Sequence, residues 1–130
     1  MTDGKLALIV GAGAGLSAAV ARQLAADGWR VFLSARNTAK LESLCAEIGV
    51  TAHACDATDP DQVAALFAAL DQSGDAPAFV LYNASRRAPG AVTDLDPVEV
   101  KTAIEISAFG GFLVAQQAAR RMLPAGEGAI

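Results

Sequence analysis

The chain has 130 residues, enough for one domain with one core, and 53% of them are hydrophobic while only 5% are aromatic. That composition suits helices packed on a buried parallel sheet, whose strands are continuous apolar runs. The net charge is −4 and no basic patch is visible, so we expect no nucleic-acid partner. No apolar run is long enough to cross a membrane, so we expect no membrane partner either.

The cysteines and the histidine bear on location and metal binding. Cys45 and Cys55 are predicted to be small buried apolar residues of a protein in the reducing cytoplasm, with a disulfide or a metal pair as the alternative. His53 is the only histidine and no CxxC spacing occurs, so no metal site is predicted.

Short apolar runs alternate with segments of helical periodicity along the chain. We predict strands at residues 5–10, 30–35, 50–55 and 78–82, and the start of a fifth strand at 128–130. Helices are predicted at 16 to about 27, at 41–48, from 60 onward and at 97 to about 122, with a loop from 83 to about 95. The expected helix-ending and helix-starting residues are Gly28, Gly49, Asp59, Pro60, Gln62, Asp96, Pro124 and Gly126.

The strict alternation of strand and helix indicates parallel strands with helices on both faces. We therefore expect an α/β fold with a doubly wound parallel sheet, the Rossmann fold, which is incomplete at its C-terminal side. One domain, residues 1–130, would hold all of it. The fourth strand would keep an exposed apolar edge.

A glycine-rich turn joins the first predicted strand to the first predicted helix. A dinucleotide pyrophosphate needs a tight turn, a backbone that comes close, and free N–H groups at a helix N-terminus. The turn meets these needs and the context is that of a dinucleotide site, although an ordinary tight turn without a ligand is the alternative. The cofactor-binding residues predicted here are Gly11, Gly13, Gly15, Leu16 and Ser17.

The end of the second predicted strand bears on the choice of cofactor. NAD-binding folds carry an acid there that takes the ribose hydroxyls, but this segment has no acid and has Arg36 instead. A guanidinium can bind a 2′-phosphate through two hydrogen bonds. We therefore expect NADP(H) to be preferred over NAD(H), which stays possible, with Ser34, Arg36 and Asn37 around the phosphate. A solvated loop charge is the alternative for Arg36.

These segments resemble the short-chain dehydrogenases/reductases. Gly11 and Gly15 match two glycines of the family's T-G-x-x-x-G-x-G turn, while Val10 replaces its threonine and Ser17 its last glycine. The resemblance implies that Asp56 meets the adenine amine, and that Asn83 and Ala84, which match the N-N-A-G segment, lie beside the cofactor ribose. Structural turn roles are the alternatives for Asp56 and Asn83.

The family's catalytic serine and Tyr-x-x-x-Lys would follow the fifth strand. The single tyrosine, Tyr82, has Arg86 four residues on and is predicted to pack in the core, so no catalytic residue is assigned. We expect the N-terminal part of a longer oxidoreductase that interconverts a small-molecule carbonyl and an alcohol, and that assembles as a homodimer or homotetramer. A non-catalytic nucleotide-binding or self-associating module is the alternative. A methyltransferase is disfavoured, because it would need an acidic residue for the ribose at the end of the second strand, where this chain has Arg36.

Overall fold

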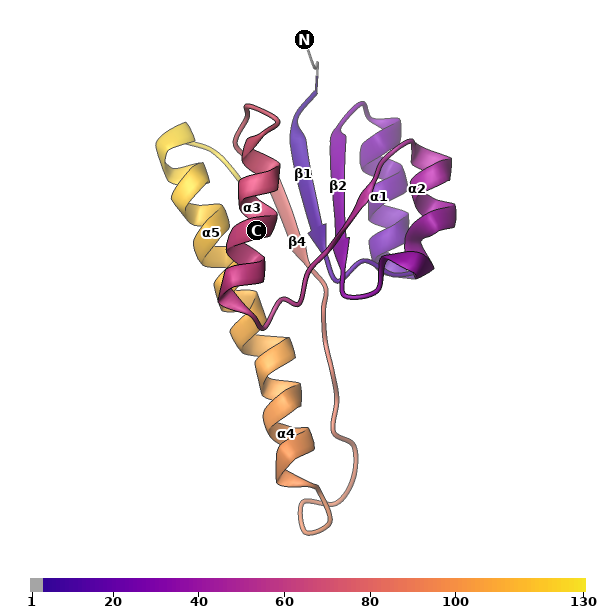
Figure 1. Ribbon diagram of the computed structural model, residues 1–130, viewed down its shortest axis with the longest axis vertical. Helices are drawn as coiled ribbons and strands as arrows, with labels where there is room; N and C mark the ends of the chain where they lie inside the picture. Colours follow the sequence, from indigo (N-terminus) through magenta and orange to yellow (C-terminus); the bar gives the residue numbers. More distant parts are fainter. Residues whose placement is uncertain (1–3) are drawn as a thin grey trace.

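The computed structural model describes residues 4–130, and its centre is a sheet of four parallel strands (Figure 1). The strands run in the spatial order β3-β2-β1-β4, so β1 lies between β2 and β4. This order confirms the predicted doubly wound parallel sheet. The strand bounds are β1 Leu6–Val10, β2 Arg30–Ala35, β3 Ala52–Ala54 and β4 Phe79–Tyr82.

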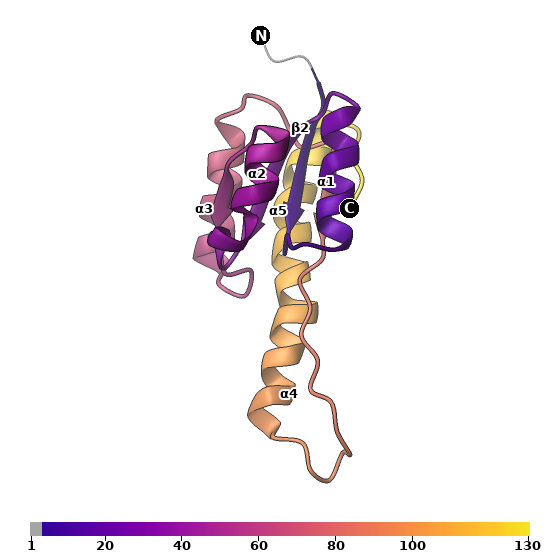
Figure 2. The same ribbon diagram turned by 90° about the vertical axis from the view of Figure 1, so that its right-hand side faces the viewer.

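Helices cover both faces of the sheet, as two views at right angles show (Figures 1 and 2). On one face lie α1 (Leu16–Ala26) and α2 (Glu42–Ile48). A short 3₁₀ turn, η1 (Thr38–Leu41), comes directly before α2. On the other face lie α3 (Pro60–Asp71) and α5 (Gly110–Ala125). Both faces are apolar because a parallel sheet between helices is buried on each side. The buried residues accordingly form two clusters, one around Ile9, Leu33 and Leu41 and the other around Leu8, Phe67 and Val114.

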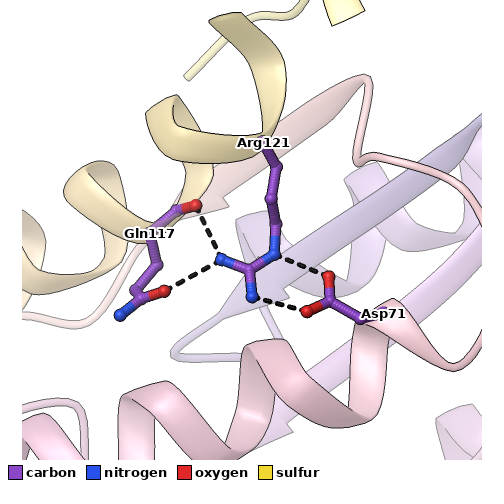
Figure 3. A network of polar contacts seen from close by, with 3 residues as sticks. All are labelled: Asp71, Gln117 and Arg121. Atoms are coloured by element: carbon purple, nitrogen blue, oxygen red, sulfur yellow. Dashed lines mark hydrogen bonds and ion pairs between the residues drawn. The ribbon is translucent and has the colours of Figure 1, made fainter. Parts of the chain in front are cut away.

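One arginine joins the two helices of the second face (Figure 3). Arg121 of α5 donates from Nε and Nη2 to the two carboxylate oxygens of Asp71, each at 2.6 Å, and from Nη1 to Oε1 of Gln117 at 2.9 Å. Its guanidinium carbon lies 5.0 Å from the ring centroid of Phe67, within the range of a cation–π contact. The pair therefore fixes the end of α3 against α5.

The helix-boundary predictions are mostly confirmed. Asp59 caps α3, since its carboxylate accepts from the N–H groups of residues 61 and 62, and Gly28 and Gly49 adopt positive φ where α1 and α2 end. Pro124 does not end α5 as predicted. It lies in the last turn, where its missing N–H removes a single hydrogen bond, and Gly126, which was also predicted, ends the helix.

The long helix predicted at 97–122 is interrupted. It consists of α4 (Pro97–Ile104), a π-helical segment (Glu105–Phe109) and α5. The third strand is also shorter than the predicted 50–55, because this edge strand pairs with only three residues of β2. Residue 129 pairs with Phe79 in one parallel bridge beside β4, which agrees with the expected start of a fifth strand.

The far end of the long helix reaches beyond the sheet. Figures 1 and 2 show α4 and the loop before it projecting past the carboxyl ends of the strands. No residue of α4 is buried. The projection therefore stands beside the sheet edge where a doubly wound fold binds its ligand. Within residues 4–130, no helix has the length and apolarity that crossing a bilayer would require.

Candidate functional site

A cavity of about 460 Å³ lies at the carboxyl ends of all four strands. Doubly wound folds bind ligands there, at the point where the strand order reverses, and here that point is between β1 and β4. Six of the predicted site residues line this cavity: Gly11, Arg36, Asn37, Asp56, Asn83 and Ala84. The remaining lining residues are Val10, Ala35, Lys40, Cys55, Ala57, Thr58, Ser85, Arg86 and Ile106.

The glycine turn is held in place by the neighbouring strand. The N–H groups of Gly11 and Ala12 both donate to the backbone oxygen of Ser34 at the end of β2, each at 3.0 Å. Gly11 has a φ of +81°, and a Cβ there would lie 2.4 Å from the backbone nitrogen of Ala84. Only glycine fits this position, because the chain leaving β4 passes directly against the turn.

The next two glycines of the turn have different surroundings. A Cβ built on Gly13 or on Gly15 would meet no protein atom within 4 Å, and neither glycine has a positive φ. The protein's own packing therefore does not require glycine at these positions, and the space above them is open. Gly15 is the N-cap of α1, whose first-turn N–H groups have no partner inside the helix. Leu16, the first helical residue, is 62% exposed.

Ser17 lies behind the turn. Its side chain is buried and its hydroxyl accepts a hydrogen bond of 2.9 Å from Nδ2 of Asn83. The same hydroxyl donates to the backbone oxygen of Gly11 at 3.4 Å, and it makes no capping bond to α1. The structural role suggested for Asn83 is thus visible, because its side chain joins the end of β4 to α1. Ser17 therefore supports the turn and does not cap α1.

The segment after β2 presents one cation to the cavity. Arg36 and Asn37 are exposed and line the cavity, and Asn37 also caps the η1 turn by accepting from the N–H of residue 39 at 3.1 Å. The expectation for Ser34 needs correction, since its side chain is fully buried and does not line the cavity. Its hydroxyl has no hydrogen-bond partner among residues 4–130. The contribution of Ser34 to this site is its backbone oxygen, which holds the glycine turn.

The segment after β3 supplies the carboxylate of the cavity. Oδ1 of Asp56 accepts from the N–H and the hydroxyl of Thr58 at 3.0 and 2.8 Å. These hydrogen bonds, with a smaller contribution from the positive charge of Arg36, hold the pKa of Asp56 below its usual range. Asp56 is therefore both a turn residue and a charged group of the cavity. Burial, followed by the nearby Asp56 carboxylate, raises the pKa of the Cys55 thiol.

Three contacts on the β4 side join residues that are far apart in the sequence and were not predicted. The hydroxyl of Ser107 bonds to both the N–H and the backbone oxygen of Arg86, each at 3.1 Å, and Nη2 of Arg86 donates to Glu99 of α4 at 2.7 Å. Tyr82 donates its hydroxyl to the backbone oxygen of Ile106 in the π-helical segment. Its ring lies against Gly110 and Gly111, where a Cβ would clash or crowd. These contacts fasten the cavity rim to the long helix.

Comparisons with known proteins agree with this geometry. A family model described as short chain dehydrogenase matches residues 5–130. The chain belongs to the short-chain dehydrogenase family. Among curated members of the family, the D-threitol dehydrogenase of Mycolicibacterium smegmatis is 36% identical over an alignment covering 98% of this chain and 51% of that protein.

Two solved structures superpose closely on this chain. An actinorhodin polyketide ketoreductase variant with NADPH has a TM-score of 0.90 and 30% identity, covering 98% of this chain and 52% of the other. An NAD⁺-bound xylitol dehydrogenase has a TM-score of 0.88 and 28% identity, covering 98% of this chain and 51% of the other. The chain spans about half the length of the curated family members it matches. The recognition of the family from the glycine turn and its companion segments is thereby confirmed.

Proposed function

We propose that residues 1–130 are the NADP(H)-binding Rossmann part of an oxidoreductase that interconverts a carbonyl and an alcohol by hydride transfer. The family assignment supports the class of reaction, and the cavity at the strand ends supports the place of the cofactor. The single observation that carries the preference for NADP(H) is the exposed Arg36 at the end of β2, where this chain has no acid.

The surroundings of the glycine turn fit a pyrophosphate. Open space above Gly13 and Gly15 leaves room for an anion close to the backbone, and the first turn of α1 offers N–H groups and the positive end of the helix dipole. We assign the pyrophosphate to Gly11, Gly13, Gly15, Leu16 and Ser17. Gly11 and Ser17 act by holding the turn, while the residues between them provide the cradle.

The residues assigned to the rest of the cofactor line the cavity. Arg36 and Asn37 would bind the 2′-phosphate of NADP(H), because a guanidinium binds phosphate through charge-assisted hydrogen bonds. Asp56 would accept from the adenine amine through Oδ2, the carboxylate oxygen that Thr58 leaves free. Asn83 and Ala84 would lie beside the ribose on the nicotinamide side. The nicotinamide cofactor supplies the hydride when bound, and the residues named here bind and orient it.

Self-association is part of this proposal. Ile104 in α4, Phe109 in the π-helical segment and Phe112 in α5 are exposed, and the rings of the two phenylalanines stack at 6.4 Å between centroids. Burying these side chains against a second copy would remove apolar surface from water. We expect a homodimer or homotetramer, which light scattering on the purified protein would detect. A mass equal to one chain at all concentrations would contradict it.

The test of the cofactor assignment is the variant Arg36→Ala. A charged hydrogen bond contributes about 1.5–3 kcal/mol, so the variant should bind NADPH about tenfold to a hundredfold more weakly. NADH affinity should stay nearly unchanged, because NADH has no 2′-phosphate. Arg120→Ala is the matched control, since Arg120 is exposed on α5 and does not line the cavity. Fluorescence titration measures both cofactors, and equal losses for both would contradict the assignment.

A further inference from the structure

A second cation shares the cavity edge with Arg36. Lys40 lies four residues further along the chain, in the η1 turn, and lines the same cavity. Two contacts hold this turn in place, because Asn37 caps its start and the side chain of Leu41 is buried at its end. The position of Lys40 at the cavity is therefore set by the fold.

The charges around this cavity edge are not balanced. In the part of the chain that the structure describes, neither Arg36 nor Lys40 forms an ion pair. The cations that do form ion pairs are bound to carboxylates that do not line the cavity. Asp56 is the one carboxylate among the residues that line the cavity, and its Oδ1 is already occupied by Thr58. The edge is thus locally positive in a chain whose net charge is −4.

Such an arrangement favours a doubly charged anion. Two cations at one edge repel each other, and a ligand that neutralises both removes that repulsion. A phosphate monoester carries a charge of about −1.5 to −2 at neutral pH, with a second pKa of about 6. The two side chains also suit one phosphate in different ways, since a guanidinium binds two oxygens in a plane while an ammonium acts as a compact point charge.

We propose that Lys40 is a second specificity-determining residue, whose ammonium binds the same ribose 2′-phosphate as Arg36. Selection for NADP(H) is then shared between two side chains and directed at the dianionic form of the phosphate. This inference rests on the proposed function, and it adds a residue to which neither the glycine turn nor the end of β2 pointed.

The experiment compares two ligand fragments, 2′,5′-ADP and 5′-AMP, that differ by the 2′-phosphate. Calorimetric titration would measure both against the wild-type protein, Lys40→Gln, Lys40→Arg and Lys101→Gln. Lys101 is the matched control, because it is an exposed lysine of α4 that does not line the cavity. We expect Lys40→Gln to weaken 2′,5′-ADP by about threefold to tenfold, since an exposed charge pair contributes up to about 1 kcal/mol, and to change 5′-AMP by less than about twofold. Lys40→Arg should retain most of the affinity.

Phosphorus NMR measures the pKa of the bound 2′-phosphate, which would not change if Lys40 only supported the structure. Cations that bind the dianion lower the pKa of the 2′-phosphate in the complex below that of the free ligand. We expect this lowering to be smaller in Lys40→Gln than in the wild type and unchanged in Lys101→Gln.

The outcomes separate this inference from the proposed function. If the wild type binds 2′,5′-ADP no better than 5′-AMP, both are overturned. If the wild type prefers 2′,5′-ADP and Arg36→Ala removes the preference while Lys40→Gln leaves it intact, only the role of Lys40 is overturned. Equal weakening of both fragments by Lys40→Gln would also overturn it, because the lysine would then act elsewhere than at the 2′-phosphate.

Discussion

Asn83 and Ser17 are 66 positions apart in the sequence, and the Asn83 side chain donates a hydrogen bond of 2.9 Å to the Ser17 hydroxyl. This contact joins the residue that follows β4 to the first turn of α1. Because the same hydroxyl donates to the backbone oxygen of Gly11, three segments around the cavity meet at one buried atom. The shape of the glycine turn therefore depends on a serine where the family pattern has glycine.

Replacing Ser17 with alanine should destabilise the protein. The change removes both hydrogen bonds and leaves the amide of Asn83 without its partner, for a cost of about 1 kcal/mol in the free energy of unfolding. Urea unfolding measures the difference. Ser43→Ala, on the exposed face of α2, is the control and should change stability by less than about 0.5 kcal/mol. No loss of stability in Ser17→Ala would mean that the contact does not support the turn.

Two glycines of the turn should respond differently to the same substitution. Gly11→Ala should unfold more easily, by about 1–3 kcal/mol, because φ is positive there and the added methyl group would collide with the backbone of residue 84. Gly13→Ala should keep its stability, because the methyl group enters open space, but it should lose affinity for NADPH by filling the pyrophosphate cradle. Unfolding and NADPH titrations on both variants test the pair. Undiminished NADPH binding by Gly13→Ala would place the pyrophosphate elsewhere.

The ion pair between Asp71 and Arg121 should make stability depend on pH. The hydrogen bonds from Arg121 hold the pKa of Asp71 below its usual range. A carboxyl whose pKa is lowered on folding stabilises the fold above its unfolded pKa, about 3.9, and loses this contribution as the pH falls through the folded value. At pH 7, Asp71→Asn should therefore be less stable than the wild type, by about 0.5–1 kcal/mol, and the gap should close in strong acid.

Unfolding curves of both proteins between pH 7 and pH 2 measure this gap. Asp94→Asn serves as the control, because Asp94 is exposed in the loop before α4 and its replacement should change stability by less than about 0.5 kcal/mol. A gap between wild type and Asp71→Asn that stays constant down to pH 2 would show that the carboxylate charge is not what stabilises the pair.

Local sequence signals were enough to predict the order of strands and helices. Each of these signals acts within a few residues and can therefore be recognised in the sequence. They are the alternating apolar segments, the helix start at Asp59 and Pro60, and the glycines that end α1 and α2. The glycine turn belongs to the same class, since its strand-turn-helix context is contiguous. The family resemblance added Asp56, Asn83 and Ala84, which the structure brings to one cavity.

What the sequence could not predict depends on contacts between distant segments. Ser34 was expected beside a phosphate, but β2 is an inner strand with both faces buried, so its side chain lies in the interior. Lys40 was overlooked because it is the 3₁₀ turn that brings it to the cavity. The π-helical segment could not be foreseen either, since the carbonyl of Ile106 bonds to Tyr82, 24 residues earlier.

We propose that the cavity at the strand ends binds NADP(H) in preference to NAD(H). The most direct test is the dissociation constants of NADPH and NADH for the unmodified protein, measured side by side at one pH and salt concentration. NADPH should bind about tenfold to a hundredfold more tightly, which is the contribution expected from a charged hydrogen bond to the 2′-phosphate. Equal affinities, or tighter binding of NADH, would contradict this preference.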